Sequence, residues 1–174
     1  SYTRMIEFNS KGNASVNSTT ADNDLVWNTS GSMNLGSGDD IVFVKDSGGG
    51  TLNGAGGEDA IIFSEISSNK TVIIDLNQAQ YVIQSPNSRV EDASNIVRQV
   101  TGFETVVGSS GNDTIVGSGT SSQNLILKGG AGDDYIIGGA GDDTILGGLG
   151  NDLLSGTAGA NSFIIEPDNS NDEI

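Results

Sequence analysis

The sequence lacks several residue types on which common protein chemistry depends. Its 174 residues include no cysteine and no histidine. The missing cysteines exclude disulfides and thiol catalysis, and without either residue type neither an ordinary zinc site nor an imidazole base can form. A serine–lysine pair is the remaining nucleophile–base option, but the lysines lie in no recognisable motif. We therefore expect that this chain is not an enzyme.

Basic residues and long apolar runs are also scarce. Lys and Arg total 7 against 23 Asp and Glu, which gives a formal net charge of −16. This charge argues against nucleic acid and anionic membranes as partners. No apolar run approaches the ~18 residues of a transmembrane helix, so no membrane insertion is expected. Residues 1–12 have neither the basic nor the apolar region of a signal peptide.

Glycine, in contrast, is abundant at 26 residues and follows a nine-residue repeat. Three tandem copies, GGAGDDYII, GGAGDDTIL and GGLGNDLLS, cover 129–155 and fit G-G-x-G-x-D-x-U-x, where U is aliphatic. Degenerate copies cover 108–116 and 156–164. Residues 117–128, three residues longer than the repeat, have Asn124 at the aspartate place. The array is too regular to be a disordered glycine-rich segment.

The rest of the chain divides around this array. Residues 1–63 show the pattern weakly, in ADNDLVW, LGSGDDIVF and NGAGGEDAII; a Gly/Asn-rich loop region is the alternative. Residues 64–103 break the period and are interpreted as an insertion, with strands at 71–76 and 80–84 and a short helix at 92–100. Residues 104–174 form the C-terminal repeat part with a closing segment.

The nine-residue period predicts an all-β fold. Six residues make a tight turn and three make a strand, so two repeats complete one 18-residue coil of a parallel solenoid. Strand alternation then directs the central aliphatic residue of each repeat inward. These predicted core residues are Val16, Val26, Met33, Val42, Leu52, Ile61, Val106, Ile115, Ile126, Ile136, Ile145, Leu154 and Phe163.

Such coils superpose the aspartates of every second repeat. Asp134 should stack on Asp152, and Asp143 should lie between Asn124 and Asn161. Two carboxylates at one strand spacing repel by about 1 kcal/mol in water and about 3.5 kcal/mol at an effective dielectric of 20. A bridging divalent cation would reverse this, and hard oxygen ligands suit Ca²⁺ better than Mg²⁺ or Zn²⁺. The predicted metal ligands, each with a solvated turn carboxylate as the alternative, are Asp24, Asp40, Asp59, Asp113, Asp134, Asp143 and Asp152.

The repeats at 129–155 resemble those of the repeats-in-toxin (RTX) family of secreted bacterial proteins. The resemblance covers 108–164 well and 21–62 loosely, and it implies a right-handed parallel β-roll that binds several calcium ions. In that family the place-six aspartates act together with turn carbonyls; Asn124 and Asn161 depart from the pattern and should weaken adjoining sites. The turn residues added to the candidate site on this basis are Gly108, Gly111, Asn112, Gly129, Gly130, Ala131, Gly132, Asp133, Gly138, Gly139, Ala140, Gly141, Asp142, Gly147, Gly148, Leu149, Gly150, Asn151 and Asn161.

The resemblance also implies type I export and an extracellular location. We expect a calcium-folded scaffold such as a surface-layer, fibre or adhesin segment; the alternative is a folding and export module of a distant catalytic domain. Self-association is predicted through an outward apolar stripe of Val107, Leu127, Leu146 and Ile164, unless the insertion or a flanking domain covers it. Glycan binding stays open, although the sequence offers no aromatic cluster for it.

Overall fold

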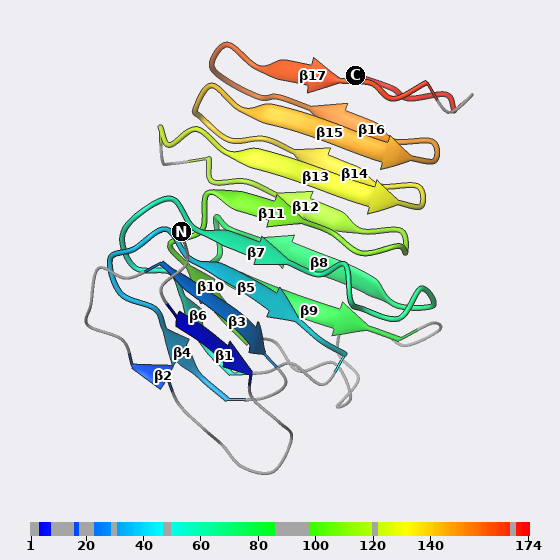
Figure 1. Cartoon of the computed structure of the whole chain (residues 1–174). Coiled ribbons are helices and arrows are strands. Elements are labelled where there is room, and N and C mark those ends of the chain that lie inside the picture. Colours follow the sequence, from blue (N-terminus) through cyan, green and yellow to red (C-terminus); the bar gives the residue numbers. More distant parts are fainter. Residues whose placement is uncertain are drawn as a thin grey trace.

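The structure, a computed structural model, describes residues 4–7, 16–17, 23–28, 31–46, 50–85, 98–119, 122–167 and 170–174. These residues form strands, turns and irregular segments but no helix (Figure 1). The described part of the chain accordingly offers no long apolar helix that could cross a membrane.

The strands build two facing sheets that share one solenoid. The eight-stranded sheet is parallel throughout. It contains, in spatial order, β1 (Arg4–Glu7), β3 (Asp24–Asn28), β5 (Ile41–Val44), β7 (Ala60–Ile62), β11 (Thr105–Val107), β13 (Ile126–Ala131), β15 (Thr144–Leu149) and β17 (Ser162–Ile164).

The nine-stranded sheet forms the opposite wall. Its order is β16 (Leu153–Ser155), β14 (Tyr135–Ile137), β12 (Thr114–Val116), β8 (Thr71–Asp75), β9 (Gln80–Gln84), β10 (Arg98–Thr101), β6 (Leu52–Asn53), β4 (Met33–Asn34) and β2 (Val16–Asn17). Outside the insertion the chain enters the two sheets alternately, which confirms the predicted parallel β-solenoid (Figure 1).

The register of the C-terminal coils confirms the 18-residue repeat. Thr144 of β15 pairs with Ile126 of β13 and with Ser162 of β17, and Tyr135 of β14 pairs with Leu153 of β16. Each coil therefore advances by one parallel strand, and equivalent positions of every second repeat superpose. Nine residues suffice because the glycine-rich turn reverses the chain within six residues.

One aliphatic residue per strand fills the interior, as predicted. Ile115, Ile136, Ile145 and Leu154 are fully buried, and Phe163 is partly buried at the last coil. The predicted N-terminal core residues are buried too, apart from Val16, whose side chain lies outside the described set: Val26, Met33, Val42, Leu52 and Ile61.

The prediction for β13 is wrong by one residue. Ile126 is 42% exposed, whereas Leu125 and Leu127 on either side of it are buried. The three extra residues of 117–128 shift the strand by one position, so that the residues next to Ile126 point inward. Because Leu125, Ile126 and Leu127 are all apolar, the sequence pattern does not show which of them face the core. Leu127 therefore belongs to the core and not to the outer stripe, where Lys128 pairs with Val107 and Leu146 instead.

The insertion contributes three strands to the nine-stranded sheet. β8 and β9 form at the predicted positions, but β9 runs antiparallel between β8 and β10. Residues 98–101 are strand β10, so the predicted helix is wrong over its last three residues, while 92–97 lie outside the described residues. Val100 of β10 is buried, and the guanidinium of Arg98 lies 5.7 Å from the ring centre of Tyr81, which favours the extended conformation.

Candidate metal centre

The place-six aspartates form a continuous ladder beside the nine-stranded sheet. Oδ1 of Asp134 accepts the backbone N–H of Asp113 at 2.7 Å, and Oδ1 of Asp152 accepts the N–H of Asp134 at 2.9 Å. The ladder continues at both ends, where Asp113 accepts the N–H of Val72 and Asp172 that of Asp152. The predicted stacking of Asp134 on Asp152 is confirmed, and each of these side chains ties its coil to the preceding one.

A second ladder follows the eight-stranded sheet. Oδ1 of Asp40 accepts the N–H of Asp24 at 2.7 Å, and Oδ1 of Asp59 accepts the N–H of Asp40 at 2.8 Å. Asp24, Asp40 and Asp59 are all buried. The three weak N-terminal repeats are thus built like the C-terminal ones.

Glu104 is a member of this second ladder that the repeat analysis missed. Its Oε2 accepts the N–H of Asp59 at 2.7 Å, and its Oε1 accepts the side-chain amide of Gln123. The side chain is 5% exposed. A usable signal was present, because Glu104 precedes T-V-V in the same way that Asp59 precedes A-I-I.

The second ladder is interrupted in the next coil. Asp143 aligns with Leu125, whose N–H it accepts at 2.9 Å, and not with Asn124 as predicted. Asn124 instead accepts the N–H of Asp142. The cause is the same one-residue shift that buries Leu127. The other predicted neighbour is correct, since Asn161 accepts the N–H of Asp143 at 3.0 Å.

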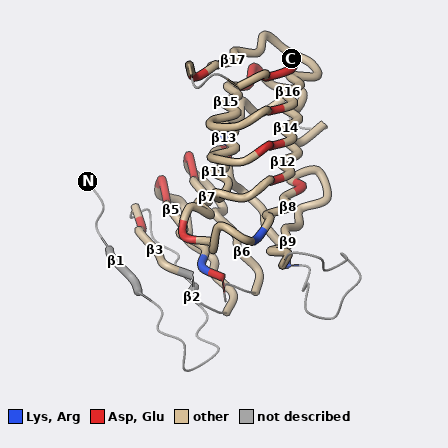
Figure 2. Tube along the Cα trace, turned by 90° about the vertical axis from the view of Figure 1, so that its right-hand side faces the viewer, with Lys and Arg blue, Asp and Glu red and all other residues tan. Residues whose placement is uncertain are grey.

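The place-five residues make a separate, exposed ladder. Oδ1 of Asn112 accepts the N–H of Asp133 at 3.0 Å, and Oδ1 of Asp133 accepts the N–H of Asn151 at 2.9 Å. These side chains reach forward along the solenoid, whereas the place-six carboxylates reach back. In Figure 2 the acidic residues accordingly recur at the turns of successive coils.

Glycine at the turns lets the backbones of stacked coils approach closely. Gly148 has φ of 110°, and a Cβ on it would lie 2.0 Å from the carbonyl oxygen of Gly130. A Cβ on Gly129 would lie 2.1 Å from Oδ2 of Asp134 and 2.5 Å from the carbonyl oxygen of Gly147. The predicted turn residues therefore bring main-chain carbonyls and aspartate oxygens together where only glycine fits.

Burial raises the pKa of several carboxyl groups in the two ladders. Burial, reinforced by the charges of Asp113, Asp152 and Asp133, raises the pKa of Asp134 to about 8. Burial likewise raises the pKa of Asp59 to about 7, with repulsion from Asp40 and Glu104 adding to the effect. The pKa values of Asp113 and Glu104 are also raised, mainly by burial.

Among the buried carboxylate oxygens of the described residues, Oδ2 of Asp59 and Oδ2 of Asp134 have no hydrogen-bond donor. Both residues are at most 2% exposed. An ionised carboxylate in this position is costly unless a cation or a donor compensates it. These oxygens therefore meet the requirement of a cation site.

The donor set fits calcium. Carboxylate and carbonyl oxygens are the ligands of this ion, which accepts six to eight of them in flexible geometry. No group of three or more acidic side chains gathers around one point among the described residues, so carbonyls must complete any site. Asp59, Asp113, Asp134, Asp143 and Asp152 would each contribute to separate calcium sites together with the glycine-rich turns. The ions would supply charge that offsets the buried carboxylates.

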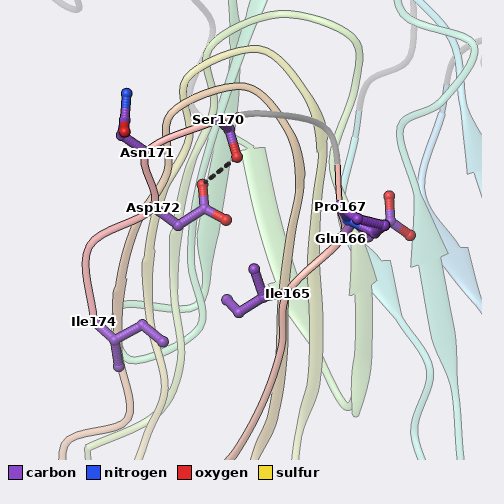
Figure 3. A pocket seen from close by; sticks show the side chains of 7 residues that line it. All are labelled: Ile165, Glu166, Pro167, Ser170, Asn171, Asp172 and Ile174. Carbon is purple, nitrogen blue, oxygen red and sulfur yellow. Dashed lines mark hydrogen bonds between the residues drawn. The ribbon is translucent and has the colours of Figure 1, made fainter.

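A cavity of about 450 Å³ lies at the C-terminal end of the solenoid (Figure 3). Among its lining residues are Glu166, Asp172 and Ser170, whose hydroxyl donates to Oδ1 of Asp172 at 3.2 Å. Asp172 is the last acceptor of the first ladder, and the bridge between Leu153 and Glu173 extends the sheet beyond β16. The closing segment thus covers part of the last coil.

Comparison with known proteins agrees with this geometry. No curated protein matches the chain. Residues 100–120 and 128–163 match the family model of the RTX calcium-binding nonapeptide repeat, in four copies. The matched residues include the turns that carry Asp113, Asp134, Asp143 and Asp152. Residues 100–163 of the chain thus carry RTX calcium-binding nonapeptide repeats, folded as part of a β-roll.

Proposed function

We propose that this chain is a non-enzymatic structural module of a secreted bacterial protein, which folds when calcium binds and then serves as an extracellular scaffold. Proteins with RTX repeats are typically secreted by bacteria, which supports the location. The observation that carries the proposal is the pair of unpartnered buried oxygens on Asp59 and Asp134. At neutral pH these carboxyl groups must either stay ionised in a desolvated site or take up protons, and both make the calcium-free stack less stable.

Calcium would act on folding because it binds the stacked turns and not the extended chain. Extracellular calcium modules bind with dissociation constants of about 10⁻⁴ to 10⁻³ M, so a cytosol low in calcium would leave the sites empty. A ligand that binds only the folded state stabilises it in proportion to the logarithm of its concentration. Folding would then follow export.

A calcium titration followed by circular dichroism tests this coupling. We expect little strand signal in chelator and a cooperative gain on addition of CaCl₂, with MgCl₂ as the matched control at equal ionic strength. An undiminished strand signal in chelator, or an equal response to magnesium, would contradict the proposal.

The outer face of the eight-stranded sheet supports the scaffold role. Its outward column runs through Trp27, Phe43, Ile62, Val107, Lys128, Leu146 and Ile164. Trp27 and Phe43 stack with ring centres 5.2 Å apart, and Ile164 is 49% exposed. An apolar column of this kind, interrupted at Lys128, is typical of a contact surface. We assign this face to contact between copies of this chain. It differs from the stripe predicted from the sequence because Lys128, and not Leu127, points outward.

Light scattering after size exclusion tests the assembly. In saturating calcium the wild type should form a concentration-dependent oligomer, and replacing Phe43 and Leu146 with Ser should leave a monomer with an unchanged calcium response. Thr114→Ser on the opposite sheet is the control. A wild type that stays monomeric at high concentration, or a double variant that still assembles, excludes this face as the contact.

A further inference from the structure

The insertion forms a groove that takes no part in the stacking of the repeats. Next to the turn between β8 and β9 lies a cavity of about 410 Å³ on the outer face of the nine-stranded sheet. Its walls come from β6, β9, β10 and this turn. The polar lining consists of Thr51, Asn53, Gln78, Gln80, Gln99 and Thr101.

The register arranges these side chains as a regular grid. Gln99 of β10 pairs with Gln80 of β9, and Thr101 of β10 pairs with Asn53 of β6. Neighbouring strands are about 4.8 Å apart and alternate residues about 7 Å apart along a strand, so hydrogen-bonding groups line two parallel rows. Buried Leu52, Val100 and Tyr81 hold the strands from the inner face.

Several of these groups are held in place before any ligand arrives. Asn53 donates to Oδ1 of Asn34 at 2.7 Å and accepts from the hydroxyl of Thr101 at 3.0 Å. Nε2 of Gln80 donates to Oε1 of Gln78 at 2.9 Å. The side-chain amide of Gln99, between these two fixed sets, makes no hydrogen bond to any described residue.

The lining is neutral in a strongly acidic protein. None of the residues that line this cavity is charged, although the chain has a net charge of −16. Amides and hydroxyls present both donors and acceptors, which matches a ligand rich in hydroxyl groups. Without a charged group the cavity has nothing to compensate a phosphate, a carboxylate or a free cation.

The groove adjoins a second cavity with a partly apolar lining. Ala79 and Thr101 also border a second cavity of about 160 Å³, whose walls include Leu76, Val100 and Phe103. A ligand in the groove can therefore place hydroxyl groups on the amides and C–H groups against Ala79 and the partly buried Leu76. Small-ligand sites commonly combine an apolar wall with a few fixed polar groups.

We propose that this groove binds a neutral carbohydrate. The ligand class is an uncharged oligosaccharide, with Gln99 as the central hydrogen-bonding residue and Asn53, Gln78 and Gln80 as its pre-positioned neighbours. The site is separate from the calcium ladders and does not depend on assembly through the eight-stranded sheet.

Saturation-transfer NMR on the full chain in saturating calcium tests the proposal. The probes are cellotetraose, maltotetraose and mannotetraose, with tetragalacturonate as the anionic comparison. We expect transfer to at least one neutral probe and none to tetragalacturonate. Circular dichroism of the same sample verifies the fold, so a failure of calcium-induced folding is distinguished from a failure of sugar binding.

Variants then locate the site. Gln99→Ala should raise the dissociation constant of the bound probe about tenfold, which corresponds to the loss of roughly one to two hydrogen bonds. Ser155→Ala, on the outer face of β16 in the same sheet, should have no effect. If Gln99→Ala misfolds, chemical-shift mapping on the wild type replaces it and must centre on 78–80 and 99–101. Absence of transfer to all neutral probes, preference for tetragalacturonate, or mapped shifts elsewhere would overturn the proposal.

Discussion

Oε2 of Glu104 accepts a hydrogen bond from the backbone N–H of Asp59, 45 residues earlier in the chain. Glu104 belongs to the segment that matches the RTX repeat, and Asp59 lies outside it. The bond therefore joins the N-terminal coils to the C-terminal array across the insertion, in the place where an aspartate would stand in a regular repeat.

Glu104→Ala should weaken this junction. The buried N–H of Asp59 would lose its acceptor, at a cost of about 1–3 kcal/mol in the free energy of unfolding. Urea unfolding in saturating calcium measures it. Glu104→Gln is the matched control, because its amide oxygen can still accept the bond while the repulsion with Asp59 disappears. Equal stability of the alanine variant and the wild type would show that the bond is not needed.

Asp134→Asn should separate calcium binding from stacking. The amide oxygen can still accept the N–H of Asp113, but the unpartnered anionic oxygen is lost. We expect the calcium concentration at the folding midpoint to rise about tenfold, since one charged ligand is removed. Asp133→Asn, at the exposed place-five position, should change it much less. The measurement is the calcium titration by circular dichroism, and equal shifts in both variants would remove Asp134 from the ligand set.

The calcium-free protein should become less stable as pH rises. Burial raises the pKa of Asp134 to about 8 and that of Asp59 to about 7, from the ordinary value of 3.8. The folded state thus binds more protons than the unfolded state between these limits, so its stability is highest below about pH 4 and is lost as pH rises towards 8. Strand signal in chelator at pH 5 should exceed that at pH 8. A stronger strand signal at pH 8 than at pH 5 would show that these carboxyl groups are not desolvated in the folded protein.

Gly148→Ala should destabilise the folded protein by about 2–4 kcal/mol, because it combines a positive φ with a carbonyl contact at the added Cβ. Gly56→Ala is the control, since no atom lies within 4 Å of a Cβ at that position. Urea unfolding in calcium compares the two. A Gly148 variant as stable as the control would mean that the stacked turns are further apart than described.

Neighbouring residues of β13 should respond differently to truncation. Leu127 is fully buried and Ile126 is 42% exposed. Leu127→Ala should cost about 2–5 kcal/mol, and Ile126→Ala well under half of that. The same urea assay distinguishes the two possible orientations of the strand. If Ile126 pointed inward, as the repeat predicts, Ile126→Ala would cost more stability than Leu127→Ala.

The sequence predicts the fold wherever the period is strict. Glycine spacing and the place of Asp134 and Asp152 determine the coil length, the superposition and the inward residue of each strand. Prediction failed where the period changed length, since 117–128 carries apolar residues in both phases. It also could not show that β9 reverses direction, because strand propensity at 80–84 carries no information on which neighbour it joins.

Glu104 escaped the repeat analysis for a chemical reason. The motif names an aspartate, and a glutamate one methylene longer reaches the same N–H from the same position before the strand. The turn carbonyls could be named only from the resemblance, because the sequence does not show which oxygens face a neighbouring coil. The neutral groove was beyond sequence reasoning, since it needs β6, β9 and β10 side by side.

The insertion gives the two walls of the solenoid unequal heights. Between β6 and β12 one wall holds three strands, β8, β9 and β10, where the opposite wall holds only β7 between β5 and β11. Two surplus strands lengthen that side by about 10 Å. If both sheets keep this strand spacing, the coils on the two sides of the insertion are tilted relative to one another instead of stacked in parallel.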